Sequence, residues 1–197
     1  MTPIRSPFAA LAGAALLLAG CASDVEVPRY ADITFQHQPA IPLDVAEIRI
    51  VKVYQPTGQP PNVETEFPVS PLDTAARWAA DRLAAVGDSG TATYRILEAS
   101  VVEKPLEKET GVTGLFTTDQ AEEYDARIVV ELALENPDAQ KAAQTRAQVS
   151  RTQTVLEGLT YNEREKIWYE LTEKLARDLD RQMEANIRQH TAIFVRD

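Results

Sequence analysis

The stretch Tyr-Asp-Ala-Arg-Ile-Val-Val-Glu-Leu-Ala-Leu-Glu, residues 124–135, has the cleanest alternation of apolar and polar side chains in this sequence. The even-numbered positions are apolar: Tyr124, Ala126, Ile128, Val130, Leu132 and Leu134. The charged positions fall mostly on the other face: Asp125, Arg127, Glu131 and Glu135. A period of two residues predicts an antiparallel strand with one face on a core and the other in water.

Three further strands are predicted around this one. Residues 94–102 precede it, and residues 145–155 follow the turn at 136–138. The segment 145–155 is polar and rich in threonine, which is typical of an exposed or edge strand. Residues 45–54 are rich in β-branched side chains on both faces, which predicts a strand that is buried at least partly on two sides.

Two helices are predicted from their caps and apolar stripes. Ser70-Pro71-Leu72-Asp73 gives the first helix an N-cap, a proline at the first position and a capping-box carboxylate. Its stripe continues through Leu83 to Val86, and Gly87 ends it. Thr160 and Glu163 form a second capping box, and the helix that follows covers residues 161–190.

These elements follow one another as strand, helix, three strands, helix. The sequence therefore predicts an α+β fold in which a four-stranded, mainly antiparallel sheet carries two helices on one face (order β-α-β-β-β-α).

The N-terminus has the layout of a secretory signal peptide. One basic residue, Arg5, precedes an apolar run of 12 residues from Phe8 to Ala19, and Gly20 and Cys21 follow. A run of 12 residues is shorter than the roughly 20 that span a bilayer. The tetrapeptide at 18–21 resembles the lipobox of bacterial lipoproteins. The resemblance implies cleavage between Gly20 and Cys21 and acylation of Cys21 with palmitate-type chains; the alternatives are a plain signal peptide with a chance cysteine and a single transmembrane helix.

The domain division follows from this interpretation. Residues 1–20 are the signal peptide, 21–42 are the lipidated cysteine and a flexible tether with three prolines, and 43–197 are a single periplasmic domain. Residue 22 is alanine rather than aspartate, which by resemblance to enterobacterial sorting favours the outer membrane.

Charge and cysteine content narrow the function classes. The formal net charge of −10 disfavours nucleic-acid binding, and we expect membrane attachment to rest on the lipid. Cys21 is the only cysteine, so after acylation no disulfide can form.

The candidate sites are few. No HExxH, GxSxG, Walker or GxGxxG pattern occurs, so we expect a protein that is not an enzyme and has no cofactor and no metal. Six carboxylates near one hairpin could serve acid/base work or calcium binding, but a solvated acidic surface is favoured: Glu103, Glu107, Glu109, Glu122, Glu123 and Asp125. The loop at 104–123 carries Val112, Leu115 and Phe116, which either contact a partner or lipid-bearing surface or fold back onto the sheet.

The lipobox-like cysteine, the proline-bearing tether and the β-α-β-β-β-α order together resemble auxiliary lipoproteins of envelope lipid transport. One such family is the auxiliary lipoprotein of MCE-type, paraquat-inducible transport systems, and the tetrapeptide at 70–73 resembles this family. The other is the LPS-assembly lipoprotein family. The loops at 55–69 and 104–123 have no counterpart in either family. The resemblance implies a periplasm-facing accessory subunit with envelope transport proteins as partners, and the alternative is a structural or stress-related outer-membrane lipoprotein.

Overall fold

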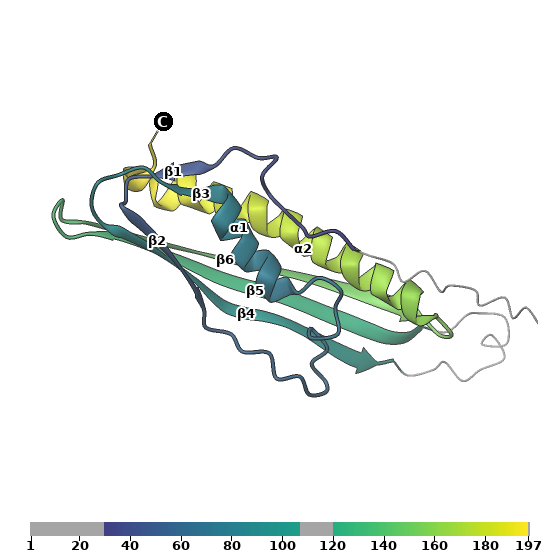
Figure 1. Cartoon of the computed structure of the whole chain (residues 1–197). Coiled ribbons are helices and arrows are strands. Elements are labelled where there is room, and N and C mark those ends of the chain that lie inside the picture. Colours follow the sequence, from purple (N-terminus) through teal and green to yellow (C-terminus); the bar gives the residue numbers. More distant parts are fainter. Residues whose placement is uncertain (1–29, 107–119, 197) are drawn as a thin grey trace, which may run out of the picture.

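The alternating stretch forms β5 (Gln120–Asn136), which pairs antiparallel with β4 (Thr91–Pro105) on one side and β6 (Lys141–Leu156) on the other. The computed structural model describes residues 30–106 and 120–196. The even-numbered side chains from Tyr124 to Leu134 are all at most 1% exposed, and α1 (Pro71–Arg82) and α2 (Tyr161–His190) cover that face (Figure 1). The predicted α+β fold is confirmed.

The sheet is mixed rather than wholly antiparallel. Its order is β2-β4-β5-β6, and β2 (Glu47–Lys52) runs parallel to β4. The antiparallel pairs are therefore β4–β5 and β5–β6, which agrees with a mainly antiparallel sheet.

Helix α2 begins and ends where the sequence predicts. The hydroxyl of Thr160 accepts from the Glu163 backbone N–H, and the Glu163 carboxylate accepts from the Thr160 N–H at 2.8 Å, so both halves of the capping box are present. One stripe of the helix is buried against the sheet: Trp168, Leu171, Leu175, Leu179, Met183 and Ile187.

Helix α1 starts as predicted, with Ser70 capping the backbone N–H of Asp73, but it ends earlier than its stripe suggests. Residues Leu83–Ala85 form a short strand, β3, which pairs in parallel with β1 (Ile41–Leu43) in a second, two-stranded sheet. Leu83 is buried as part of this strand, whereas Val86 is exposed. The predicted helix to residue 86 is wrong because backbone partners from β1 compete with the helical hydrogen bonds.

The predicted tether also reaches too far. Phe35 and Ile41 belong to the hydrophobic core, although the sequence assigned residues up to 42 to a flexible segment. Arg82 and Asp81 of α1 bind the backbone of this segment, which explains why its prolines do not leave it free. The packed domain therefore includes residues well before 43.

Strand β2 contradicts the expectation of burial on two sides. Ile48 is half-buried, but Ile50, Val51 and Val53 are between 38% and 50% exposed. Ile50 is exposed because β2 is the terminal strand of its sheet and pairs only with β4 among the described strands, and Val51 is exposed because it lies on the face opposite the two helices. At the far end of the chain, the 3-10 helix Ala192–Phe194 docks back, and Phe194 is buried.

Candidate functional site

Several sequence-predicted site residues lie outside the described residues. These are Gly20 and Cys21 at the proposed cleavage and lipidation site, and Val112, Leu115 and Phe116 at the proposed contact. Their roles stay predictions.

Of the six carboxylates predicted near the β4–β5 hairpin, Glu107 and Glu109 lie outside the described residues, and Glu122, Glu123 and Asp125 pair with neighbouring side chains. Asp125 accepts from Lys104 and, at 2.7 Å, from the Thr152 hydroxyl, and these hydrogen bonds lower the pKa of Asp125. Glu122 lies 3.0 Å from Arg164, while burial and the nearby Glu122 charge raise the pKa of Glu103. Within residues 30–106 and 120–196, no group of three or more His, Cys, Asp or Glu side chains is arranged to hold a metal ion.

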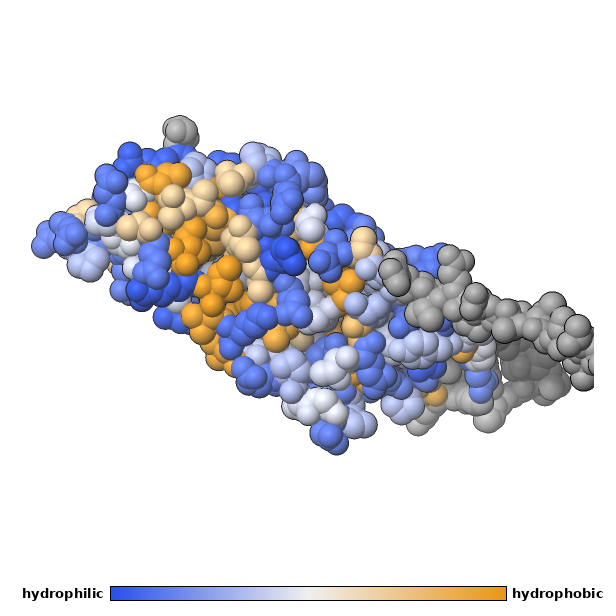
Figure 2. Space-filling view, viewed as in Figure 1, coloured by the Kyte–Doolittle hydropathy of each residue, from blue (hydrophilic) through white to orange (hydrophobic). Residues whose placement is uncertain are grey.

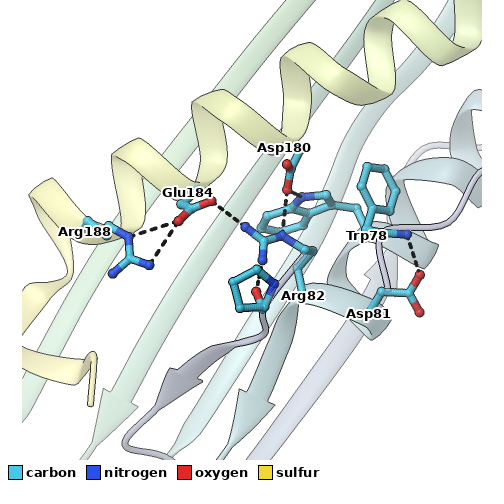
Figure 3. A network of polar contacts seen from close by, with 8 residues as sticks. Trp78, Asp81, Arg82, Asp180, Glu184 and Arg188 are labelled. Atoms are coloured by element: carbon cyan, nitrogen blue, oxygen red, sulfur yellow. Dashed lines mark hydrogen bonds and ion pairs between the residues drawn. The ribbon is translucent and has the colours of Figure 1, made fainter. Parts of the chain in front are cut away.

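The most buried charge in the described chain belongs to Arg82, the last residue of α1 (Figure 3). Its side chain is 0% exposed, and its Nε donates to Asp180 Oδ1 of α2 at 2.7 Å. Its two terminal nitrogens donate to Glu184 of α2 and to the carbonyl of Pro39. Trp78 Nε1 donates to the same Asp180 oxygen at 2.9 Å. We call Trp78, Arg82, Asp180 and Glu184 the Arg82 cluster.

The Arg82 cluster joins three segments that are far apart in the sequence. A buried guanidinium must have carboxylate and carbonyl partners, because an unpaired buried charge costs several kcal/mol. Asp81 of α1 makes a second contact with the segment before β1, because its carboxylate accepts a hydrogen bond from the Phe35 backbone N–H at 2.9 Å. The cluster therefore positions the chain's N-terminal segment along α2.

The sequence does not predict this cluster, because the charges between the apolar positions of the last helix are most simply interpreted as a solvated helix face. Asp180 and Glu184 are spaced i, i+4 and lie toward Arg82, with side chains 17% and 32% exposed. One signal was present: Arg82 follows Ala79 by three residues, on the apolar stripe of α1.

A groove of about 440 Å³ lies beside the Arg82 cluster, between residues 33–38 and α2. Its lining includes His37 and two arginines, Arg177 and Arg181. Each arginine already pairs with a carboxylate of its own helix, Arg177 with Glu173 at 3.0 Å and Arg181 with Asp178. The groove therefore offers an anion no unpaired arginine.

Four of the seven large hydrophobic side chains that are exposed in the described chain lie on or near β2. Ile50 pairs with Tyr94 and shares the helix-covered face, whereas Val51 pairs with Arg95 and lies on the opposite face. Val86, 52% exposed, follows the neighbouring β3. Figure 2 shows apolar residues gathered over this part of the molecule. We call Ile50, Val51, Val53 and Val86 the β2 edge surface.

The two edges of the sheet differ in chemistry. Strand β6 forms the other edge and presents Gln144, Arg146, Gln148, Ser150 and Thr152, all exposed. Polar and charged side chains protect an edge strand against pairing with another chain, and β2 has only Glu47, Arg49 and Lys52 for that purpose. A strand that leaves apolar side chains exposed on both faces is suited to binding a protein.

Comparison with known proteins gives distant structural likenesses. No protein-family model matches the chain, and no curated protein matches it. The fold is similar to a minor lipoprotein from Acinetobacter baumannii, with a TM-score of 0.39 and 13% identity over 71% of this chain and 93% of that chain. It is also similar to rare lipoprotein B from Shewanella oneidensis, with a TM-score of 0.36 and 17% identity over 71% and 93% of the two chains.

A third likeness is to a Xanthomonas campestris protein of the DUF330 family, with a TM-score of 0.35 and 11% identity over 82% of this chain and 92% of that chain. Two of these three proteins are named lipoproteins. None of the helices in the described residues is long and apolar enough to cross a membrane.

Proposed function

We propose that the protein is anchored by lipid at Cys21 in the outer membrane, faces the periplasm, and serves as a non-catalytic accessory subunit of an envelope lipid or LPS transport system. The β2 edge surface is the observation that carries this proposal. An accessory subunit needs a surface for another protein, and the described chain offers one at the edge of its sheet.

An exposed edge strand recognises a partner through its backbone and its side chains together. The free backbone groups of β2 can extend the sheet by one strand, and Ile50, Val51 and Val53 can be covered on both faces. Strand β2 is thus the proposed docking strand, whereas the buried Arg82 cluster stabilises the fold.

The anchor and the domain lie close together along the chain. Eight residues, 22–29, separate Cys21 from Tyr30, where the described chain begins. Nine residue steps span at most about 30 Å when fully extended. A lipidated Cys21 would therefore hold the domain beside the membrane. The maximum distance between the two, about 30 Å, is less than half the ~70 Å that the longer predicted tether of 21 residues would allow.

A photo-crosslinking residue in place of Val51 tests the proposed docking strand, with Gln148 of the opposite edge as the matched control. We expect capture of a permease, an MCE-type protein or an outer-membrane barrel component from position 51 and not from 148. Equal capture at both edges, or none at position 51, contradicts the assignment.

The anchor has its own test. Replacing Cys21 by serine should leave the signal peptide uncleaved by the lipoprotein peptidase and remove palmitate labelling. A Cys21→Ser variant that still labels contradicts the lipidation, and steady-state residence of the wild-type protein in the inner membrane contradicts the outer-membrane assignment.

The alternative is a structural or stress-related outer-membrane lipoprotein without a transport role. A deletion strain with normal lipid and LPS distribution but altered envelope integrity would favour it. Val112, Leu115 and Phe116 remain a second candidate site for contact with a partner. If they contact a partner, replacing Leu115 and Phe116 together by serine abolishes partner co-purification without lowering the melting temperature.

A further inference from the structure

The described chain begins at one end of the molecule. The hydroxyl of Tyr30 donates to the Asn162 carbonyl in the first turn of α2, at 3.5 Å, and its ring lies 5.0 Å from that of Tyr169. From there, residues 30–39 run along α2 as far as the Arg82 cluster (Figure 1). Tyr30, the first described residue, therefore lies at the N-terminal end of α2.

That same end exposes large side chains with apolar surface. Tyr161, the first residue of α2, is 62% exposed, and Leu156, the last residue of β6, is 47% exposed. A turn of four residues, 157–160, connects them, so both lie where β6 passes into α2. We call Tyr30, Leu156, Tyr161 and Tyr169 the tyrosine end.

We propose that the tyrosine end rests on the lipid surface to which Cys21 is anchored. This inference rests on the proposed lipidation, because the anchor lies within about 30 Å of Tyr30. Tyrosine is enriched at membrane–water interfaces, since its ring is apolar and its hydroxyl stays hydrated. Leu156 adds a purely apolar, exposed side chain at the same end of the molecule.

The charges around the tyrosine end indicate which lipids it contacts. Carboxylates at Glu157, Glu163 and Glu165 outnumber the cations of Arg164 and Lys166. A negative end is repelled by anionic headgroups, and the repulsion is felt within about one Debye length. The partner surface is therefore a zwitterionic one, such as phosphatidylethanolamine, and added anionic lipid weakens the contact.

This orientation sends α2 away from the membrane. The helix has 30 residues and is therefore about 45 Å long, with the 3-10 helix Ala192–Phe194 at its far end. Strand β2 lies in that far half of the molecule (Figure 1), so the β2 edge surface is held out toward the periplasm.

The single cysteine of the sequence makes the orientation measurable. Acylation of Cys21 removes its thiol, so an introduced cysteine is the only site for a fluorescent label. We compare Tyr161→Cys with Ile193→Cys, because the native side chains are 62% and 59% exposed at opposite ends of α2. Each full-length lipidated variant carries an environment-sensitive nitrobenzoxadiazole label in phosphatidylethanolamine/phosphatidylcholine vesicles that contain headgroup spin-labelled lipid.

The expected result is several-fold stronger quenching at position 161 than at 193, with weaker quenching at 161 when phosphatidylglycerol is added. Equal quenching at the two positions, or no quenching at 161 in protein that floats with the vesicles, overturns the inference and leaves the lipid anchor standing. If the protein does not float with the vesicles at all, the lipid anchor is contradicted and both proposals are overturned. Unchanged melting of the two variants confirms that the label reports on a folded domain.

Discussion

At the residue scale, Arg82 has the largest expected effect on stability. Its guanidinium is fully buried and bonded to Asp180, Glu184 and the Pro39 carbonyl. Replacing Arg82 by methionine keeps the length of the side chain but leaves two carboxylates without their shared cation. We expect a loss of about 3–5 kcal/mol in the free energy of unfolding, measured by urea denaturation.

Arg188 is the matched control, because it also binds Glu184, at 3.0 Å, but its side chain is 56% exposed. Arg188→Met should cost less than about 1 kcal/mol. If both variants lose a similarly small amount, the Arg82 cluster does not hold the N-terminal segment.

A second residue-scale prediction concerns Tyr94. Its hydroxyl is buried without a hydrogen-bond partner among the described residues, and burial raises its pKa. Because an unpaired buried hydroxyl costs about 1–3 kcal/mol, Tyr94→Phe should leave stability unchanged or raise it by up to that amount. The ring contact with Trp78, 5.5 Å between centroids, is kept.

Tyr54→Phe should behave in the opposite way. The Tyr54 hydroxyl donates to Glu64 at 2.7 Å, so its removal should cost about 1 kcal/mol or more. Chemical denaturation of the two variants side by side gives the comparison. A clear loss of stability in Tyr94→Phe would mean that the hydroxyl has a partner.

At the element scale, an ion pair between β6 and α2 makes stability depend on pH. Arg151 Nε donates to Asp178 Oδ2 at 2.6 Å, and this hydrogen bond is the main cause that lowers the pKa of Asp178. An acid whose pKa is lower in the folded than in the unfolded state stabilises the fold above the unfolded value, about 3.9. That stability is lost as the pH falls through the folded pKa.

We therefore expect the wild-type chain and Arg151→Gln to differ most in stability above about pH 5 and to converge as the pH falls through the lowered pKa of Asp178. Urea unfolding across that pH range measures the difference. A difference that stays constant with pH would mean that the pair does not contribute through the Asp178 carboxylate.

The elements that the sequence predicts well are those set by local pattern. Strand β5 and helix α2 carry long, regular periods, and α2 also has a capping box, so their types and most of their bounds follow from the residues alone. Strand β3 does not, because Leu83–Ala85 continues a helical stripe and becomes a strand only by pairing with residues 41–43.

The candidate sites divide in the same way. The lipobox-like motif is contiguous in the sequence, so its prediction needs no structure, whereas the partners of Arg82 lie 98 and 102 residues away on another helix. The exposure of β2 depends on which strand ends the sheet, a property of the whole fold that β-branched composition does not carry. Local pattern therefore predicts the lipobox-like motif, whereas only the packed fold shows that β2 is exposed.

At the scale of the whole molecule, the first part of the described chain is an integral part of the packed domain. Residues 30–42 cross α1 and α2, place Phe35 and Ile41 in the core, and supply most of β1. A chain that begins at Tyr30 should therefore unfold like the mature protein, since it keeps all of these contacts.

A chain that begins at Leu43 should be strongly destabilised. It loses Phe35 and Ile41, which alone correspond to roughly 2–5 kcal/mol each when such buried side chains are removed, and it strips the Pro39 carbonyl from Arg82. Because small domains have only about 5–15 kcal/mol of net stability, we expect this shorter chain to be largely unfolded or readily cleaved by trypsin at Arg82. Circular dichroism with urea and timed proteolysis of the two chains measure the effect. Equal stability of both chains would mean that residues 30–42 are a flexible tether. A domain anchored by lipid at Cys21 could then lie up to ~70 Å from the membrane instead of about 30 Å.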